Sequence, residues 1–355
     1  MTLIICNSMF QLFTAVVIRQ TFLKEKKVDL LLTDATSSFA EMSKKEKLRD
    51  IFDNVMYTPV LNNIARLSRM EKSHYFSKVF NLFPKYYVKR VWKIDTGKYD
   101  ELFFSLYQLF SIRLAKHLKR KNKASKIHLF EDGISTYLID DKTLGNRNVA
   151  SLNAQALIDD IYLFAPDLMC LETSKPLITI PKIDRSSEIA ELLNMVFGDS
   201  AYEIREKFIF FEESFNNDGY TTNDAELIEL LRDTAQSEFI IKHHPRNAVN
   251  RFAGKMNTLS VPILWEQYIL NHSIENKVIV TVSSNTAFVP QIICGSCPYV
   301  VFLYKIFNGT SPILQSGNFE NYVAKYVSRF KEYADKKIFF PETIEEYKDI
   351  IQKLL

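Results

Sequence analysis

The sequence predicts an α/β protein of two domains, each built around a doubly wound parallel β-sheet. Short β-branched and aliphatic runs alternate with segments of helical periodicity along the chain, which is typical of that fold class. The alternation weakens between residues 140 and 200 and starts again at residue 207. In addition, a chain of 355 residues exceeds the usual size of one hydrophobic core. We therefore expect one domain at 1–180 and a second at 181–355.

In the N-terminal domain, apolar runs of strand length precede segments whose apolar residues recur at helical spacing. Strands are expected at 2–6, 28–34, 54–60, 101–106 and 126–130. Helices are expected at about 9–24, 38–53 and 108–122, with a long basic helical stretch after residue 60. Three prolines make the segment 140–200 irregular, and we expect it to hold the crossover between the domains.

The same pattern predicts the elements of the C-terminal domain. Strands are expected at 207–211, 238–242, 261–265, 277–282 and 299–304. Helices are expected at about 223–235, 286–295, 318–333 and 342–354.

The apolar N-terminus and the cysteines bear on the compartment. The first 20 residues contain Asn7, Ser8 and Gln11 and lack a basic region and a cleavage site, which favours a buried strand and helix over a signal peptide. Four cysteines in 355 residues are too few for a disulfide framework. We interpret the CxxC of Cys294 and Cys297 as two small buried side chains rather than a redox or zinc pair. A cytoplasmic protein is expected.

Positive charge is concentrated in residues 65–126, which hold 16 Lys and Arg residues against four Asp and Glu. Aromatic residues are interleaved with these charges, so the region could attach peripherally to the inner face of an anionic membrane. The alternative is a solvated helix face. No zinc-finger, RRM-like or helix-turn-helix pattern accompanies the charge, so no nucleic-acid partner is expected.

Several common sites are missing from the sequence, including GxGxxG, the P-loop, GxSxG and HExxH. The chain has only nine glycines and no Asp-x-Asp motif to hold a metal on a diphosphate. We therefore expect chemistry that uses neither a metal nor a bound cofactor.

Three polar segments follow predicted strands, at the sheet edge where open α/β proteins bind ligands. The first is Glu131-Asp132-Gly133, in which a carboxylate could act as a general base and the glycine allows a tight turn. The alternative is that Asp132 caps a helix.

The other two segments suit an anion. In His243-His244-Pro245-Arg246, His244 can donate a hydrogen bond or a proton to a phosphate and Arg246 adds positive charge, whereas His243 is the more structural member. Ser283-Ser284-Asn285 places hydroxyl and N–H groups before an expected helix. Capping alone would also explain Ser284 or Asn285.

The order of these three segments is shared among bacterial sialyltransferases, and the chain most resembles the lipooligosaccharide sialyltransferase family (glycosyltransferase family 52). The resemblance runs from residue 3 to about residue 304 and is loose between the matching blocks. Those blocks are, in order, LIICNSMFQLFTAVVI, HLFEDGISTYL, IIKHHPR, PILWEQYIL and VTVSSNTAF.

This resemblance implies a GT-B-type pair of facing Rossmann-like domains, with the acceptor on the N-terminal side and CMP-sialic acid on the C-terminal side. It implies inverting, metal-independent transfer of sialic acid to a terminal galactose of lipooligosaccharide or capsule, and it favours a homodimer. By matching motif, His244 would contact the CMP phosphate and assist its departure. Ser283 and Ser284 would hold the same phosphate, and Glu266 would bind the ribose hydroxyls. For a lipid-linked acceptor, region 65–126 would supply the membrane attachment.

The general base is where the sequence departs from the family pattern. The aspartate expected after the first strand of the C-terminal domain falls near Phe215, so its role could pass to Asp218 or Glu213. Related sialyltransferases use the acidic-pair aspartate, which favours Asp132, with Asp218 second. Two other functions stay open: a glucosyltransferase of the same fold that uses a UDP-sugar, and a non-catalytic protein that binds a glycan or lipid surface.

Overall fold

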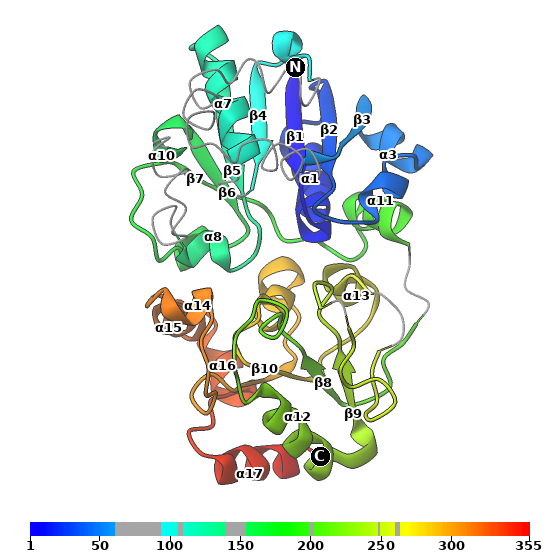
Figure 1. The fold of residues 1–355 in the computed structure, drawn as a ribbon, viewed down its shortest axis with the longest axis vertical. Coiled ribbons are helices and arrows are strands. Elements are labelled where there is room, and N and C mark those ends of the chain that lie inside the picture. Colours follow the sequence, from blue (N-terminus) through cyan, green and yellow to red (C-terminus); the bar gives the residue numbers. More distant parts are fainter. Residues whose placement is uncertain (61–93, 106–108, 140–153, 199–201, 248, 260–262) are drawn as a thin grey trace, which may run out of the picture. The chain divides into compact units, whose positions relative to one another are not determined.

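The computed structural model describes residues 1–60, 94–105, 109–139, 154–198, 202–247, 249–259 and 263–355 (Figure 1). These residues form two compact units, each with its own parallel sheet. Unit 1 comprises Met1–Asp167, Leu171–Pro181 and Glu191–Val196, and unit 2 comprises Leu168–Cys170, Lys182–Ala190 and Phe197–Leu355. The predicted fold class, two α/β domains with parallel sheets, is confirmed.

The sheet of unit 1 has seven strands in the order β3-β2-β1-β4-β5-β6-β7, all paired in parallel. Its strands are β1 (Thr2–Cys6), β2 (Val28–Thr33), β3 (Asn54–Thr58), β4 (Glu101–Phe104), β5 (Lys126–Phe130), β6 (Asp160–Leu163) and β7 (Leu177–Thr179). Strands β6 and β7 lie in the segment expected to be irregular. They have only four and three residues, too few for a clear strand pattern beside the prolines.

The central strands of this sheet are mostly buried and largely apolar, as expected of a parallel sheet covered on both faces. In β1, for example, Leu3, Ile4 and Ile5 have no exposed surface, and each such side chain stabilises the fold by about 1.5–3 kcal/mol. The helical elements are α1 (Met9–Phe22), α2 (Phe39–Met42), α3 (Glu46–Ile51), η2 (Thr96–Lys98), α7 (Leu109–Lys121), α8 (Ser135–Leu138), α10 (Ala154–Leu157), η3 (Pro166–Leu168) and α11 (Glu188–Phe197).

Two expectations for unit 1 need comment. The single helix expected at 38–53 is wrong, because Lys45 adopts an extended conformation that separates α2 from α3. The basic helical stretch after residue 60 lies outside the described residues as far as residue 93.

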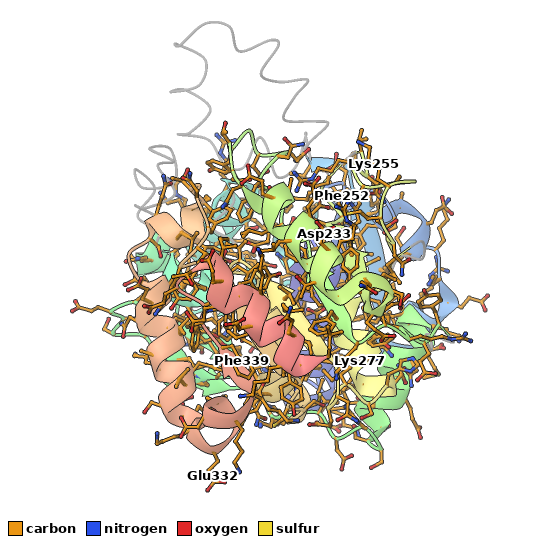
Figure 2. All side chains as sticks on the ribbon, turned by 90° about the horizontal axis from the view of Figure 1, so that it is seen from below. Asp233, Phe252, Lys255, Lys277, Glu332 and Phe339 are labelled. Atoms are coloured by element: carbon orange, nitrogen blue, oxygen red, sulfur yellow. The ribbon has the colours of Figure 1, made fainter. Side chains whose placement is uncertain are left out.

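The sheet of unit 2 has five parallel strands in the order β12-β11-β10-β8-β9. They are β8 (Phe208–Phe211), β9 (Phe239–Lys242), β10 (Val278–Thr281), β11 (Tyr299–Phe302) and β12 (Ile338–Phe339). Helices α12 and α17 lie side by side over one face of this sheet, which Figure 2 shows from below. Their apolar residues, among them Leu231 and Ile351, pack with Val280 and Val301 in one core.

The helical elements of unit 2 are α12 (Asp224–Ala235), η4 (Gln236–Glu238), α13 (Trp265–Asn271), η5 (Asn285–Ala287), η6 (Pro290–Cys294), α14 (Pro312–Gln315), α15 (Phe319–Arg329), α16 (Lys331–Lys337) and α17 (Ile344–Leu354). No helix of the described residues in either unit is long and apolar enough to cross a bilayer.

Three local expectations for unit 2 are corrected. The helix expected at 286–295 is instead a 3₁₀ turn, η5, followed by a π-helix, η6, because Pro290 has no N–H to continue an α-helix from residue 286. Trp265, expected to end a strand, begins α13, and residues 260–262 before it are outside the described part of the chain. Cys294 and Cys297 are free thiols that are half-buried rather than buried.

Candidate active site

The acidic pair of unit 1 forms a tight turn at the end of β5. Gly133 has a φ of 83°, in the left-handed region that glycine adopts without strain. The Asp132 N–H donates to Thr136 Oγ1 at 2.9 Å, which closes the turn. The N-cap of the following helix α8 is Ile134, so the interpretation of Asp132 as a helix cap is wrong.

Glu131 faces the interior of unit 1. Its side chain is 2% exposed, and Oε2 accepts hydrogen bonds from the Tyr137 hydroxyl and, at 2.8 Å, from the Phe164 N–H. Burial raises the pKa of Glu131 to about 7, although the two hydrogen bonds oppose the shift. Glu131 therefore connects the turn to the chain after β6.

Asp132 has a different environment, because two side chains from the start of α1 reach it. Gln11 Nε2 donates to Asp132 Oδ1 at 2.7 Å, and Ser8 Oγ donates to the same oxygen at 3.2 Å. Ser8 is also the N-cap of α1 and accepts from the Gln11 N–H at 3.2 Å. Both residues break an apolar segment of the sequence, and both lie in the first block of the family resemblance, which includes Gln11. Their position directly after a buried strand was the signal that could have identified them.

In unit 2, Glu212 organises the loop that follows β9. Its side chain is 1% exposed, and Oε2 accepts from the His244 N–H at 3.2 Å. The same oxygen lies 2.7 Å from His243 Nδ1, a close contact without hydrogen-bond geometry. Arg251 Nε donates to Glu212 Oε1 at 3.0 Å. Neither Glu212 nor Arg251 was predicted from the sequence, and the structural role expected of His243 stays a prediction.

His244 is held in one tautomer by its own loop. The Arg246 N–H donates to His244 Nδ1 at 3.1 Å, so in the neutral ring the proton lies on Nε2. Burial, followed by the positive charges of Arg246 and Lys242, lowers the pKa of His244 to about 4. At neutral pH the side chain is therefore an uncharged N–H donor beside two cations.

Asp218 lies next to Arg246 in unit 2. Its Oδ2 accepts from Ser214 Oγ at 2.6 Å and lies 3.7 Å from an Arg246 guanidinium nitrogen. The Asp218 N–H donates to the Ser214 carbonyl at 2.9 Å, which fixes the turn that ends in Gly219. The Asp218 carboxylate therefore accepts a hydrogen bond from Ser214 and lies beside Arg246.

The side chains of Glu213 and Ser283 bind each other. The Ser283 N–H donates to Glu213 Oε1 at 2.7 Å, and Ser283 Oγ donates to Oε2 at 2.8 Å. Thr281 Oγ1 adds a longer bond at 3.2 Å. Burial raises the pKa of Glu213 to about 7 against the effect of these bonds. Ser283 is fully buried, so its donors serve the carboxylate of Glu213.

Ser284 and Asn285 form the outer part of this turn. Ser284 Oγ accepts from the N–H of Thr286 at 3.4 Å and from its hydroxyl at 3.1 Å, as the N-cap of η5. Asn285 Oδ1 is buried without a hydrogen-bond partner among the described residues. The turn is therefore tied together at Ser284 and has an unused acceptor at Asn285.

Glu266 lies in the first turn of α13, which is fastened to the Ser284 turn by a bond from Trp265 Nε1 to the Thr286 carbonyl at 3.0 Å. Glu266 is 7% exposed, and burial raises its pKa while the charge of Lys242 opposes the shift. Glu266, Lys242 and the Ser284 turn are therefore linked parts of one unit. Within the described ranges, no group of three or more His, Cys, Asp or Glu side chains is arranged to hold a metal ion.

Comparisons with known proteins give a family. The family model for alpha-2,8-polysialyltransferase (POLYST) matches residues 2–301. No curated protein sequence matches the chain.

Solved structures share the fold at low identity. An alpha/beta-galactoside alpha-2,3-sialyltransferase from Photobacterium phosphoreum is 12% identical, with a TM-score of 0.51 over 97% of this chain and 98% of that one. Arabidopsis thaliana UGT89C1, complexed with UDP-L-rhamnose, is 10% identical, with a TM-score of 0.53 over 99% and 89% of the two chains. The glycotransferase of kitacinnamycin is 10% identical, with a TM-score of 0.55 over 99% and 89%. These likenesses show that the fold is the GT-B fold of glycosyltransferases.

Proposed function

The chain belongs to the alpha-2,8-polysialyltransferase (POLYST) family, and we propose that it transfers sialic acid from CMP-sialic acid to a bacterial surface glycan, with inversion and without a metal ion. Family membership supports the reaction class, a sialyltransferase. The observation that carries the choice of donor is His244, an uncharged N–H donor whose pKa is lowered by burial and by the nearby charges of Arg246 and Lys242. Such a group suits a phosphate monoester that leaves with negative charge.

In the proposed reaction, the bond between C2 of sialic acid and the phosphate oxygen of CMP breaks. CMP leaves with the electron pair of that bond, so negative charge develops on the phosphate. His244 Nε2–H would donate a hydrogen bond to the phosphate, and Arg246 and Lys242 would supply positive charge. Because the pKa of His244 is about 4, the side chain takes part as a hydrogen-bond donor rather than as an imidazolium acid.

The acceptor hydroxyl supplies the new bond to C2 from the opposite face, and its proton goes to a carboxylate. We assign this role to Asp132, which is partly exposed and oriented by donors from α1. Asp218 is the second candidate. Its carboxylate contacts Arg246, which we assign to the leaving phosphate, and this argues for Asp132.

The remaining candidates have supporting roles in the proposal. Ser284 and the buried Oδ1 of Asn285 would contact the donor, and Glu266 would bind the ribose hydroxyls. Ser283 and Glu213 would support the Ser284 turn without contacting the donor, since they bind each other. The donor is thus assigned entirely to unit 2.

Two acceptors follow from different observations. The resemblance to glycosyltransferase family 52 favours a terminal galactose of lipooligosaccharide or capsule. The family match favours a terminal sialic acid extended through an α2,8 linkage. A homodimer, and peripheral attachment to a membrane through the basic region, are further parts of the proposal. The segment 65–93 of that region lies outside the described residues.

Calorimetric titration with CMP, CDP, UDP and UDP-glucose in EDTA tests the donor. Micromolar binding of CMP with weak binding of uridine nucleotides would support the proposal. A preference for UDP or UDP-glucose would replace it with a glucosyltransferase, and absence of binding would favour a non-catalytic surface protein. Arg246→Ala should weaken CMP binding about tenfold. Arg232→Ala is the matched control, because Arg232 is also an exposed arginine paired with an aspartate in unit 2, and it should leave binding unchanged.

A product assay then decides the acceptor. Galactose-terminated and sialic acid-terminated fluorescent glycans would be incubated with CMP-sialic acid, and the added mass and the anomeric configuration of the product would be measured. An α-linked product from the β-configured donor would support inversion. Turnover of neither acceptor, with CMP bound, would contradict both acceptor assignments.

A further inference from the structure

A chain of hydrogen bonds crosses the carboxyl edge of the unit 1 sheet and ends at Asp132. It begins at the end of β2, where the Thr33 hydroxyl donates to Asn7 Oδ1 at 2.8 Å and, three residues later, the Thr36 hydroxyl donates to the Asn7 carbonyl at 2.8 Å. Asn7 follows β1 directly and passes the chain to Gln11. Gln11 donates to Asp132 at 2.7 Å. Three segments distant in sequence are thereby joined at one carboxylate.

The orientation of the Gln11 amide is determined by its partners. Gln11 Oε1 accepts from the main-chain N–H of Asn7 at 2.6 Å and from Asn7 Nδ2 at 3.2 Å. Because both partners are donors, this end of the amide must be the oxygen, and the nitrogen must face Asp132 Oδ1. Gln11 is 1% exposed, so water does not compete with these bonds.

We propose that Gln11 is a positioning residue for Asp132. It fixes the carboxylate in one orientation and favours its ionised form, so that Asp132 can accept the proton of the acceptor hydroxyl. The inference rests on the proposed function, and within it on Asp132 as the base. It adds to that function a residue that contacts neither the donor nor the acceptor.

Other groups also face Asp132 and have to be separated from Gln11. Ser8 Oγ is a second donor to the same oxygen. Titratable neighbours include Glu131, the preceding residue, and Cys6 at the end of β1. Burial raises the pKa of both, and the charge of Asp132 adds to the shift. Both are acidic groups, so when ionised they oppose the charge of Asp132, whereas the amide of Gln11 stabilises it.

The test is the pH dependence of kcat/KM for sialyl transfer in Gln11→Met, Gln11→Glu and wild type. Gln11→Met removes the hydrogen-bond donor and keeps a side chain of similar length. The acidic limb of the kcat/KM profile should then move up by about one pH unit. At the plateau of the profile, kcat should be about tenfold lower than in wild type. Gln11→Glu keeps an oxygen for Asn7 and places a second carboxylate against Asp132. The acidic limb of this variant should move to still higher pH, because two close carboxylates share a proton and one of them is ionised only at a higher pH.

Thr14→Val is the control for a loss of packing in the same helix. Thr14 is fully buried and its hydroxyl donates to the Phe10 carbonyl at 3.0 Å, away from Asp132. This variant should lower the melting temperature without moving the pH limb. If Gln11→Met does not fold, Gln11→Glu decides the result, since it preserves the bonds to Asn7.

The two ideas can fail separately. Wild-type turnover by Asp132→Asn would overturn the assignment of the base, and with it the inference. If Asp132→Asn is inactive but neither Gln11 variant moves the limb, Gln11 is structural and the proposed function stands. In the Asp132→Asn background, Gln11→Met should cause no further loss of residual activity, and an additive loss would also overturn the inference.

Discussion

The protonation state of His244 leads to a prediction that separates two mechanisms for the departure of CMP. The structure gives His244 as a neutral ring with its proton on Nε2, because Nδ1 accepts from the Arg246 N–H. Replacement by Gln places an amide N–H near the former Nε2, whereas Ala provides no donor. We therefore expect His244→Gln to keep much of the activity that His244→Ala loses.

The size of the effect follows from the pKa. With a pKa of about 4, only about one His244 side chain in 3,000 is protonated at pH 7.5. A mechanism that needs His244 as an imidazolium acid would therefore use only this small protonated fraction of the enzyme. A hydrogen bond to a charged phosphate corresponds to about 10–100-fold in rate. We therefore expect kcat to fall about 100-fold in His244→Ala and less than about tenfold in His244→Gln.

The assay combines turnover with a direct titration of the ring. CMP release from CMP-sialic acid would be measured in both variants at saturating donor. The ¹³C-labelled histidine spectrum of the wild type would be recorded from pH 4 to 8, and the signal absent from His244→Gln would be assigned to His244. This signal should not titrate above about pH 5.5.

Two results would refute the reasoning. One is a His244 signal with a midpoint near the ordinary histidine pKa of 6.5, which would show that the ring is not held neutral. The other is a His244→Gln variant as inactive as His244→Ala, which would mean that the reaction needs a proton and not only a hydrogen bond.

Three further predictions concern other groups. Asp132→Asn should abolish transfer while Asp218→Asn retains most of it, measured as kcat side by side; the reverse order would move the base to unit 2. Glu131 has a folded-state pKa of about 7, above its ordinary value of 4.5, so its stabilising contribution is present at low pH and is lost as the pH rises through 7. The free energy of unfolding, measured in urea, should therefore fall between pH 5 and pH 8 by about 2–3 kcal/mol less in Glu131→Gln than in wild type. An equal fall in both proteins would contradict the raised pKa. Charge reversal at the exposed residues Arg120 and Lys121 should weaken sedimentation with anionic vesicles, and unchanged sedimentation would remove membrane attachment through this helix.

The sequence predicted the parts of the fold that depend on local pattern. Long buried runs such as β1 and β2 are distinct, because strands covered on both faces are mostly apolar, and only Thr2, Asp29 and Thr33 are polar in these two. Strand β7 has only three residues and lies between Pro176 and Pro181, so it carries too little pattern to be recognised. The break at Pro290 could have been predicted from the missing N–H, but the apolar residues around it suggested a continuous helix.

The residues of the candidate site also fall into two groups, those that local sequence predicts and those that only the fold brings together. Asp132 and His244 were identified because they follow predicted strands, and the ends of parallel strands share one edge of the sheet. Arg246, which donates to His244, was identified from the same motif, but the more distant partners were not. Gln11 is 121 residues from Asp132 and Glu212 is 32 residues from His244, so only the folded sheet brings them together. Burial, which moves the pKa of Glu131 and Glu213 to about 7, likewise depends on the whole fold.

The way in which the chain is shared between the units has a consequence for biosynthesis. Residues 191–196 belong to unit 1, although residues 168–170 and 182–190, which precede them, belong to unit 2. On the ribosome, the N-terminal unit therefore cannot complete its packing when residue 180 emerges and must wait for residue 196. A fragment cut after residue 180 would lack the buried side chains of Leu193 and Val196. Separate expression of the halves would thus remove part of the core of the half that carries Asp132.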